Sequence, residues 1–133
     1  MLDSFRFHHI GVVTSDINKT AGYYIDAGYR MGSIIEDTTQ SVYISFLEKE
    51  GMPTIELITP ASDSSPVNKT LERLGVSPYH FCYTVDDIDG AVEELKKKAY
   101  IMLHRPVEAV ALGNKRICFM FNMAVGLIEL LES

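Results

Sequence analysis

Two histidines and two glutamates have the types and the spacing to do chemistry. Glu56, in TIELI, follows His9 by 47 residues, and Glu129, in LIELL, follows His80 by 49. A glutamate flanked by aliphatic residues on a predicted central strand must face solvent, a paired charge or a metal, because an isolated buried carboxylate is very costly. Two imidazoles and two carboxylates suit a divalent cation such as Zn²⁺, Ni²⁺, Co²⁺ or Mn²⁺. Positions left open on that ion would let it polarise a substrate oxygen.

Each of these residues also has a purely structural interpretation. A strand histidine commonly packs in the core or at its rim, and a strand glutamate commonly points to solvent. Recurrence of the set at matching places in two parts of the chain favours the metal-ligand interpretation. His8 has no histidine counterpart, because Tyr79 stands at that place in the second copy, so we expect it at the rim of the site. We expect His104 at the surface or in a loop.

An internal repeat must position these residues. The stretch HIGVVTSDINKTAGYYIDAGY from His9 matches HFCYTVDDIDGAVEELKKKAY from His80 at an offset of 71 residues. The register of the repeat then shifts by two residues, and SVYISF and TIEL in the first copy correspond to KRICFMF and LIEL in the second. Self-similarity of this kind determines the architecture.

Each copy predicts one strand, one helix and three further strands. The first strands, 7–13 and 79–85, lead to Asp16 and Asp87, which we expect to be helix N-caps. Apolar residues at helical spacing follow each cap. The later β-prone runs are 31–36, 41–48 and 54–59 in the first copy, and 101–104, 115–121 and 126–131 in the second.

The predicted fold is therefore α+β, with two tandem βαβββ modules forming a curved, partly open mixed β-sheet with a central metal site. A βαβββ unit curls its sheet, so that its first and last strands can be neighbours. We expect a single domain over residues 1–133, with module one at 5–60, a linker at 61–76 and module two at 77–133. The linker carries a short amphipathic helix from Pro66 to Leu74.

Composition narrows the function classes. The chain has 133 residues, of which 47% are hydrophobic, and a net charge of −6. The acidic balance argues against a nucleic-acid partner. No apolar run reaches the length of a membrane span and no signal peptide is visible, so we expect a cytoplasmic protein without a membrane partner. Cys82 and Cys118 lie in apolar runs and are expected to be core thiols, with a reactive or metal-binding role as the alternative. Exposed strand edges suggest a homodimer.

Over nearly its whole length the chain resembles the vicinal oxygen chelate superfamily of glyoxalase-like metalloenzymes. The stretches that carry the resemblance are HHIGVVTSDINKTAGYY, SSPVNKTLERLGVSPYHFCYTVDDIDGAVEELKKK and VGLIELLE. They are most similar to the branch of glyoxalase I-like proteins and methylmalonyl-CoA epimerase. The resemblance implies that His9, Glu56, His80 and Glu129 are the metal ligands, and that the reaction moves a proton next to a metal-polarised oxygen.

One position departs from the epimerase pattern. The resemblance to this branch implies that an epimerase would carry a second glutamate as catalytic base. In this sequence, the stretch TTQSVYI has Thr39 at that place. Glu36 or Asp37 could replace it only if the strand register differs. Epimerisation is most simply done by two opposed bases, whereas a glyoxalase-type proton shuttle can use one.

The leading hypothesis is therefore a metal-dependent lyase or isomerase of glyoxalase I type acting on a thiol adduct. Its catalytic base would be Glu129, with Glu56 as the pseudo-symmetric partner. Lys115 and Arg116 could bind an anionic thiol carrier, or simply end a solvated strand. The alternative is methylmalonyl-CoA epimerase or a related acyl-CoA epimerase, with a thioester substrate. A third hypothesis is a non-catalytic binding protein of the drug-resistance type.

Overall fold

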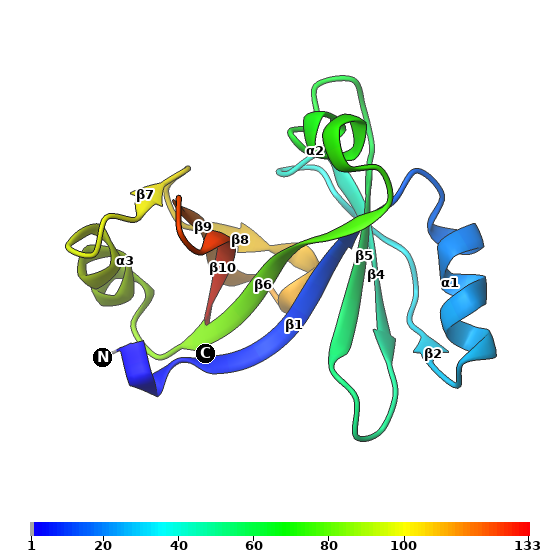
Figure 1. Ribbon diagram of the computed structural model, residues 1–133, viewed down its shortest axis with the longest axis horizontal. Helices are drawn as coiled ribbons and strands as arrows, with labels where there is room; N and C mark the ends of the chain where they lie inside the picture. The colour runs from blue at the N-terminus through cyan, green and yellow to red at the C-terminus, as the bar shows by residue number, and fades with distance from the viewer. Residues whose placement is uncertain (1) are drawn as a thin grey trace. The chain divides into compact units, whose positions relative to one another are not determined.

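The computed structural model describes residues 2–133, which contain three α-helices and ten β-strands (Figure 1). Two compact units divide the chain. The first, called here the His9 unit, contains residues 9–79. The second, the His80 unit, contains residues 80–133 together with the N-terminal segment that ends at His8.

The His9 unit holds two helices and five strands, except for the part of β1 that precedes His9. Their bounds are β1 Arg6–Val13, α1 Ile17–Asp26, β2 Arg30–Met31, β3 Ile35–Asp37, β4 Val42–Glu48, β5 Thr54–Pro60 and α2 Val67–Leu74. The strands follow the order β2-β4-β5-β1, with β3 also beside β4. Strands β1 and β5 are parallel, and the other pairs are antiparallel. The first and last strands of the repeat are thus direct neighbours, as predicted.

The His80 unit repeats this topology. Its elements are β6 Ser77–Val85, α3 Ile88–Lys96, β7 Ile101–Met102, β8 Val107–Ala109, β9 Lys115–Asn122 and β10 Gly126–Glu132, with short 3₁₀ turns at Leu2–Ser4 and Val110–Leu112. The order is β7-β9-β10-β6, with β8 beside β9, and β6 and β10 are parallel. The predicted α+β fold with two βαβββ repeats is confirmed.

Both long helices begin where the sequence predicts. The Asp16 carboxylate accepts a hydrogen bond from the amide of Lys19 at 3.0 Å, and Asp87 accepts one from the amide of Gly90 at 3.1 Å. Such caps satisfy amides that have no partner within the helix. A Cβ at Gly90 would lie 2.5 Å from the Asp87 carboxylate, so a larger residue there would displace this cap. The linker helix α2 confirms the prediction for Pro66–Leu74, with Pro66 at its N-cap.

Each long helix covers one face of its own sheet. In the His9 unit, Ile17 and Ala21 of α1 pack against Val12, Leu47, Ile55 and Leu57. In the His80 unit, Ile88, Ala91, Val92 and Leu95 of α3 pack against Val85, Met120, Ile128 and Leu130. Successive strand residues point to opposite faces of a sheet. Residues 9, 56, 80 and 129 therefore lie on the faces that these helices leave uncovered.

The edge strands differ from the prediction. The expected strand 31–36 is divided into β2 and β3, because the three residues between Met31 and Ile35 stand opposite only two residues between Leu47 and Ile44. In the His80 unit, the four residues between Met102 and Val107 stand opposite only two residues of β9, so the expected strand 101–104 ends early and β8 follows. Extra residues of this kind interrupt a ladder locally.

None of the helices found in residues 2–133 has the length and apolar character that a membrane crossing needs.

Candidate functional site

In the His9 unit, an imidazole and a carboxylate meet on two parallel neighbouring strands. The Nε2 atom of His9, on β1, lies 3.1 Å from Oε1 of Glu56, on β5. Both side chains are buried, with 0% and 3% of their surfaces exposed. The ring of Phe46 meets the His9 ring edge-on at 5.6 Å between centroids, and Phe46 is the ladder partner of Glu56 on β4. Three strands thus fix one His–Glu pair.

The His80 unit builds the same arrangement from the second repeat. Nε2 of His80, on β6, lies 3.2 Å from Oε1 of Glu129, on β10, and each residue is 3% exposed. Phe119 of β9 meets the His80 ring edge-on at 5.1 Å and is the ladder partner of Glu129. The structure therefore brings each predicted histidine to its predicted glutamate. The repeat already matches Phe46 with Phe119, but their contact with the two histidines was not predicted.

The chemistry of these pairs fits a divalent cation. Burial of a carboxylate costs several kcal/mol unless a counter-charge or hydrogen bonds compensate it. Each unit instead buries a carboxylate against an imidazole nitrogen, and nitrogen and oxygen are the donor atoms that Zn²⁺, Ni²⁺, Co²⁺ and Mn²⁺ take from proteins. Each pair can serve as one half of a metal site, or as a base with an orienting histidine.

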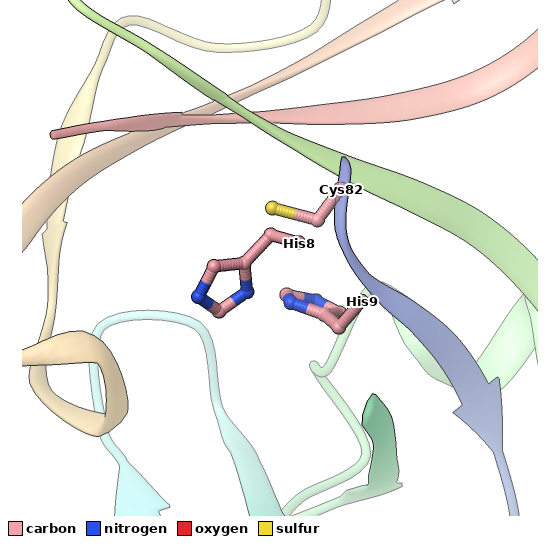
Figure 2. Close-up of side chains that lie close together, drawn as sticks. All are labelled: His8, His9 and Cys82. Atoms are coloured by element: carbon pink, nitrogen blue, oxygen red, sulfur yellow. The ribbon is translucent and has the colours of Figure 1, made fainter. Parts of the chain in front are cut away.

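Two further polar side chains lie close to these pairs in the chain, and Figure 2 draws them with His9. His8 precedes His9 on β1 and is half-buried, and Cys82 is the ladder partner of Glu129 and is fully buried. A ring nitrogen of His8 lies within 4.8 Å of the Cys82 thiol, and both belong to the His80 unit. Cys118 is also fully buried and free, and burial raises its pKa to about 11. Both cysteines are thus the core thiols that the sequence predicted.

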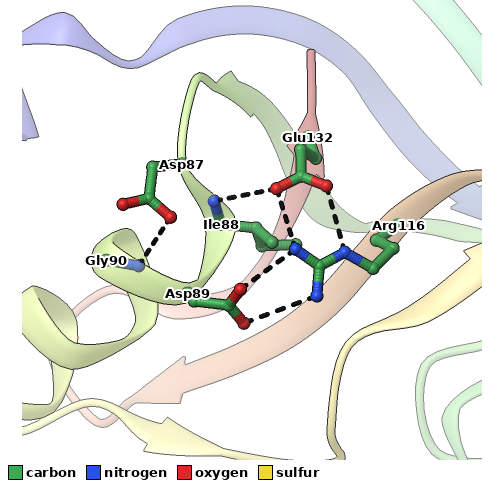
Figure 3. A network of polar contacts seen from close by, with 6 residues as sticks. All are labelled: Asp87, Ile88, Asp89, Gly90, Arg116 and Glu132. Atoms are coloured by element: carbon green, nitrogen blue, oxygen red, sulfur yellow. Dashed lines mark hydrogen bonds and ion pairs between the residues drawn. The ribbon is translucent and has the colours of Figure 1, made fainter.

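The predicted anion-binding residues differ in their surroundings. Lys115 is exposed at the start of β9. The Arg116 guanidinium instead donates to Glu132 at 2.9 and 3.0 Å and to Asp89 at 3.0 Å (Figure 3). These bonds raise the pKa of Arg116 and hold the pKa of Glu132 below its usual range. Glu132 also accepts from the amide of Ile88, so the network connects β9 and β10 to the start of α3.

The segment that would carry an additional base has no exposed carboxylate at the expected place. Thr39 is exposed in the turn that follows β3, and Glu36 is exposed on β3. Asp37 is 1% exposed, and its two carboxylate oxygens accept from the amide and the side chain of Gln40, at 3.0 and 2.6 Å. Asp37 therefore holds the turn that contains Thr39.

His104 was expected at the surface or in a loop, and it lies half-buried between β7 and β8. Its Nε2 accepts a hydrogen bond from the amide of Phe119 at 3.2 Å. No spacing or repeat partner in the sequence marks this residue.

Comparison with known proteins corrects the leading functional hypothesis. The chain is 30% identical over 95 residues to the mitochondrial methylmalonyl-CoA epimerase of Mus musculus, covering 70% of this chain and 53% of that protein. It is 29% identical over 129 residues to the Homo sapiens enzyme, covering 94% and 72%. The chain thus spans about half the length of the mouse relative. Because these relatives are epimerases, the prediction of a glyoxalase I-type lyase is wrong, and the epimerase alternative fits better.

Solved structures agree on the fold. A Streptomyces coelicolor methylmalonyl-CoA epimerase in complex with 2-nitronate-propionyl-CoA superposes with a TM-score of 0.82 at 22% identity, covering 96% of this chain and 94% of that one. The family model of the glyoxalase/bleomycin resistance protein/dioxygenase superfamily matches residues 8–119. The chain belongs to the glyoxalase/bleomycin resistance protein/dioxygenase superfamily.

Proposed function

We propose that this chain is an epimerase of acyl-CoA thioesters of the methylmalonyl-CoA type. The relatives named methylmalonyl-CoA epimerase support the reaction, and the Streptomyces coelicolor complex with an acyl-CoA ligand supports the thioester class. We further propose that the two units act as one domain, and that the protein is a homodimer. The observation that carries the proposal is the repeated pair: each unit buries one carboxylate against one imidazole.

The repeat supplies the two bases that epimerisation needs. The reacting carbon lies between a thioester carbonyl and a carboxylate, and the thioester carbonyl makes its proton acidic. Inversion removes that proton from one face of the carbon and returns a proton to the other face, which two bases on opposite faces do most simply. Glu56 and Glu129 are the two bases in this proposal. His9 and His80 orient them, as their Nε2 atoms lie 3.1 and 3.2 Å away.

Each His–Glu pair, His9 with Glu56 and His80 with Glu129, would offer two ligands to a divalent cation. The chemistry supplied by a bound cation is Lewis-acid stabilisation of the negative charge that develops on a carbonyl oxygen. Exclusion of water strengthens this electrostatic effect, because charges interact more strongly in a medium of low dielectric constant. The burial of all four side chains supports such a site.

If Glu56 is the second base, epimerisation does not need a carboxylate at position 39, where this chain has Thr39. Threonine offers no carboxylate, Glu36 faces solvent, and Asp37 is engaged by Gln40. Glu56 is the buried carboxylate that the first repeat places in the position equivalent to Glu129. The exposed Lys115 is proposed to contact the phosphates of the CoA carrier, whereas Arg116 is held by Glu132 and Asp89.

The test is turnover of (2R)- and (2S)-methylmalonyl-CoA by the metal-free protein and by protein loaded separately with Co²⁺, Ni²⁺, Mn²⁺ or Zn²⁺. Glu56→Gln and Glu129→Gln should each lower kcat by about 10²- to 10⁴-fold, the usual contribution of a general base. Glu48→Gln, at an exposed strand end of the His9 unit, is the matched control and should keep wild-type turnover. Absence of turnover with every ion, or full turnover in either variant, would contradict the proposal.

A further inference from the structure

His104 occupies a gap in the His80 sheet that the His9 sheet fills differently. Strand β7 ends at Met102 and β8 begins at Val107, so residues 103–106 leave the regular ladder beside β9. His104 lies in this gap and is half-buried. The thiol of Cys118, on β9, donates to its carbonyl oxygen at 3.1 Å, which fixes the backbone of His104 against β9.

The imidazole of His104 takes the place of a missing ladder bond. The amide of Phe119 donates to Nε2 at 3.2 Å, so Nε2 carries no proton, and Nδ1 donates to the carbonyl oxygen of Arg105 at 2.7 Å. The carbonyl oxygen of Phe119 accepts from the amide of Leu103 at 3.0 Å. Both backbone groups of Phe119 on this side of β9 are therefore bound by residues of the gap. The two rings also touch, with centroids 5.8 Å apart.

Phe119 in turn contacts both members of the His80–Glu129 pair. Its ring lies edge-on against the His80 ring, at 5.1 Å and 87°, and its backbone pairs with Glu129 in the antiparallel ladder. A displacement of Phe119 would therefore move the ring that packs against His80 and the β9 backbone that lies opposite Glu129. All four residues, including His104, belong to the His80 unit.

The His9 unit lacks an equivalent imidazole. Phe46 has the same relation to His9 and Glu56, and its carbonyl oxygen accepts from the amide of Gly32 at 2.8 Å. The segment between β2 and β3 contains only Gly32, Ser33 and Ile34. The aromatic contact is thus shared by the repeats, whereas the imidazole support is specific to the His80 unit.

We propose that His104 is a positioning residue for the His80–Glu129 pair. It acts through Phe119, fixing the backbone opposite Glu129 and the ring that borders His80. This proposal rests on the proposed epimerase function, because it takes the His80–Glu129 pair to be part of the catalytic site. Residues that orient a metal ligand typically change metal affinity by about 10- to 100-fold.

The test compares His104→Leu and His104→Gln with Arg105→Ala. Leucine fills space but cannot accept the Phe119 amide proton, whereas the glutamine side-chain oxygen can. Arg105 is exposed and contributes only its backbone oxygen, which makes it the matched control. The readouts are the ¹³C–¹H resonance of the His80 ring in metal-free protein, Co²⁺ affinity by calorimetry, and the thermal midpoint of unfolding.

His104→Leu should shift and broaden the His80 ring resonance and weaken Co²⁺ binding by about tenfold. His104→Gln should restore most of both properties, and Arg105→Ala should match the wild type. A lower thermal midpoint in His104→Leu or His104→Gln with an unmoved His80 resonance would overturn the proposal, because that result describes a purely structural role. The His80 resonance is measured without substrate, so wild-type protein that fails to epimerise would refute the function and leave this test intact.

Discussion

Asp37 offers a sharp test of which carboxylates take part in catalysis. It is 1% exposed, and it accepts hydrogen bonds from the Gln40 amide at 3.0 Å and from the Gln40 side chain at 2.6 Å. It also lies close in sequence to Thr39, where an epimerase base is expected. In the proposed mechanism, Asp37 holds the turn and Glu56 acts as a base. Asp37→Asn should therefore lower stability while leaving turnover intact.

The magnitude follows from the two hydrogen bonds. A hydrogen bond to a charged group contributes about 1.5 to 3 kcal/mol, and a neutral one about 1 kcal/mol. Asparagine keeps one acceptor oxygen and can pair its amide with a rotated Gln40 side chain, so both bonds persist in neutral form. The expected loss is about 2 kcal/mol in the free energy of unfolding. For a domain of this size that corresponds to a fall of roughly 6–8 °C in Tm.

The assay pairs urea and thermal denaturation with turnover of methylmalonyl-CoA. Asp37→Asn should unfold earlier by the stated amount and retain kcat within about twofold, as expected for a residue outside the catalytic site. Thr38→Ala, an exposed change in the same turn, is the control and should leave both properties unchanged. A hundredfold loss of kcat at unchanged stability would show that Asp37 is a base and would refute the role given to Glu56.

Three further outcomes follow from the His80 unit. Because Arg116 lowers the pKa of Glu132, this ion pair stabilises the fold fully above about pH 5, and the stabilisation is lost as the pH falls through the lowered pKa. The difference in urea midpoint between wild type and Arg116→Met should therefore shrink from pH 7 to pH 3. An unchanged difference would contradict this prediction. The pKa of Cys118, about 11, predicts negligible reaction with a disulfide reagent at pH 8 in native protein and rapid reaction after unfolding. Lys115→Ala should raise KM for the thioester roughly two- to fivefold at constant kcat, and an unchanged KM would remove it from the CoA contact.

The repeat predicts most of the architecture, because local sequence determines its helices and its longer strands. Asp16 and Asp87 precede apolar residues at helical spacing, and both cap helices in the structure. The pairing of His9 with Glu56 follows from the first and last strands of one repeat being parallel neighbours. The division of the edge strands was not predictable, since β2, β3, β7 and β8 are two or three residues long and depend on pairing with distant strands.

The functional prediction failed for a physical reason. Thr39 argues against epimerisation only if a base must stand at that one position. A proton can be moved by any carboxylate that reaches the carbon, and we propose Glu56 of the first repeat for this role. One fold supports several chemistries in this superfamily, so the fold alone did not decide between lyase and epimerase. The sequence predicts only that His104 lies at the surface or in a loop, because its contact with Phe119 forms across the sheet.

The most direct test of the two-base proposal is stereochemically resolved exchange of the α-proton of methylmalonyl-CoA in D₂O, followed by NMR with each epimer separately. Wild-type protein should deuterate and invert both epimers. Glu56→Gln should exchange the proton of one epimer without inverting it, and Glu129→Gln should do the same for the other, since each variant retains one base on one face. Inversion at the wild-type rate by either variant, or loss of exchange for the same epimer in both, would contradict the assignment of Glu56 and Glu129 as opposed bases.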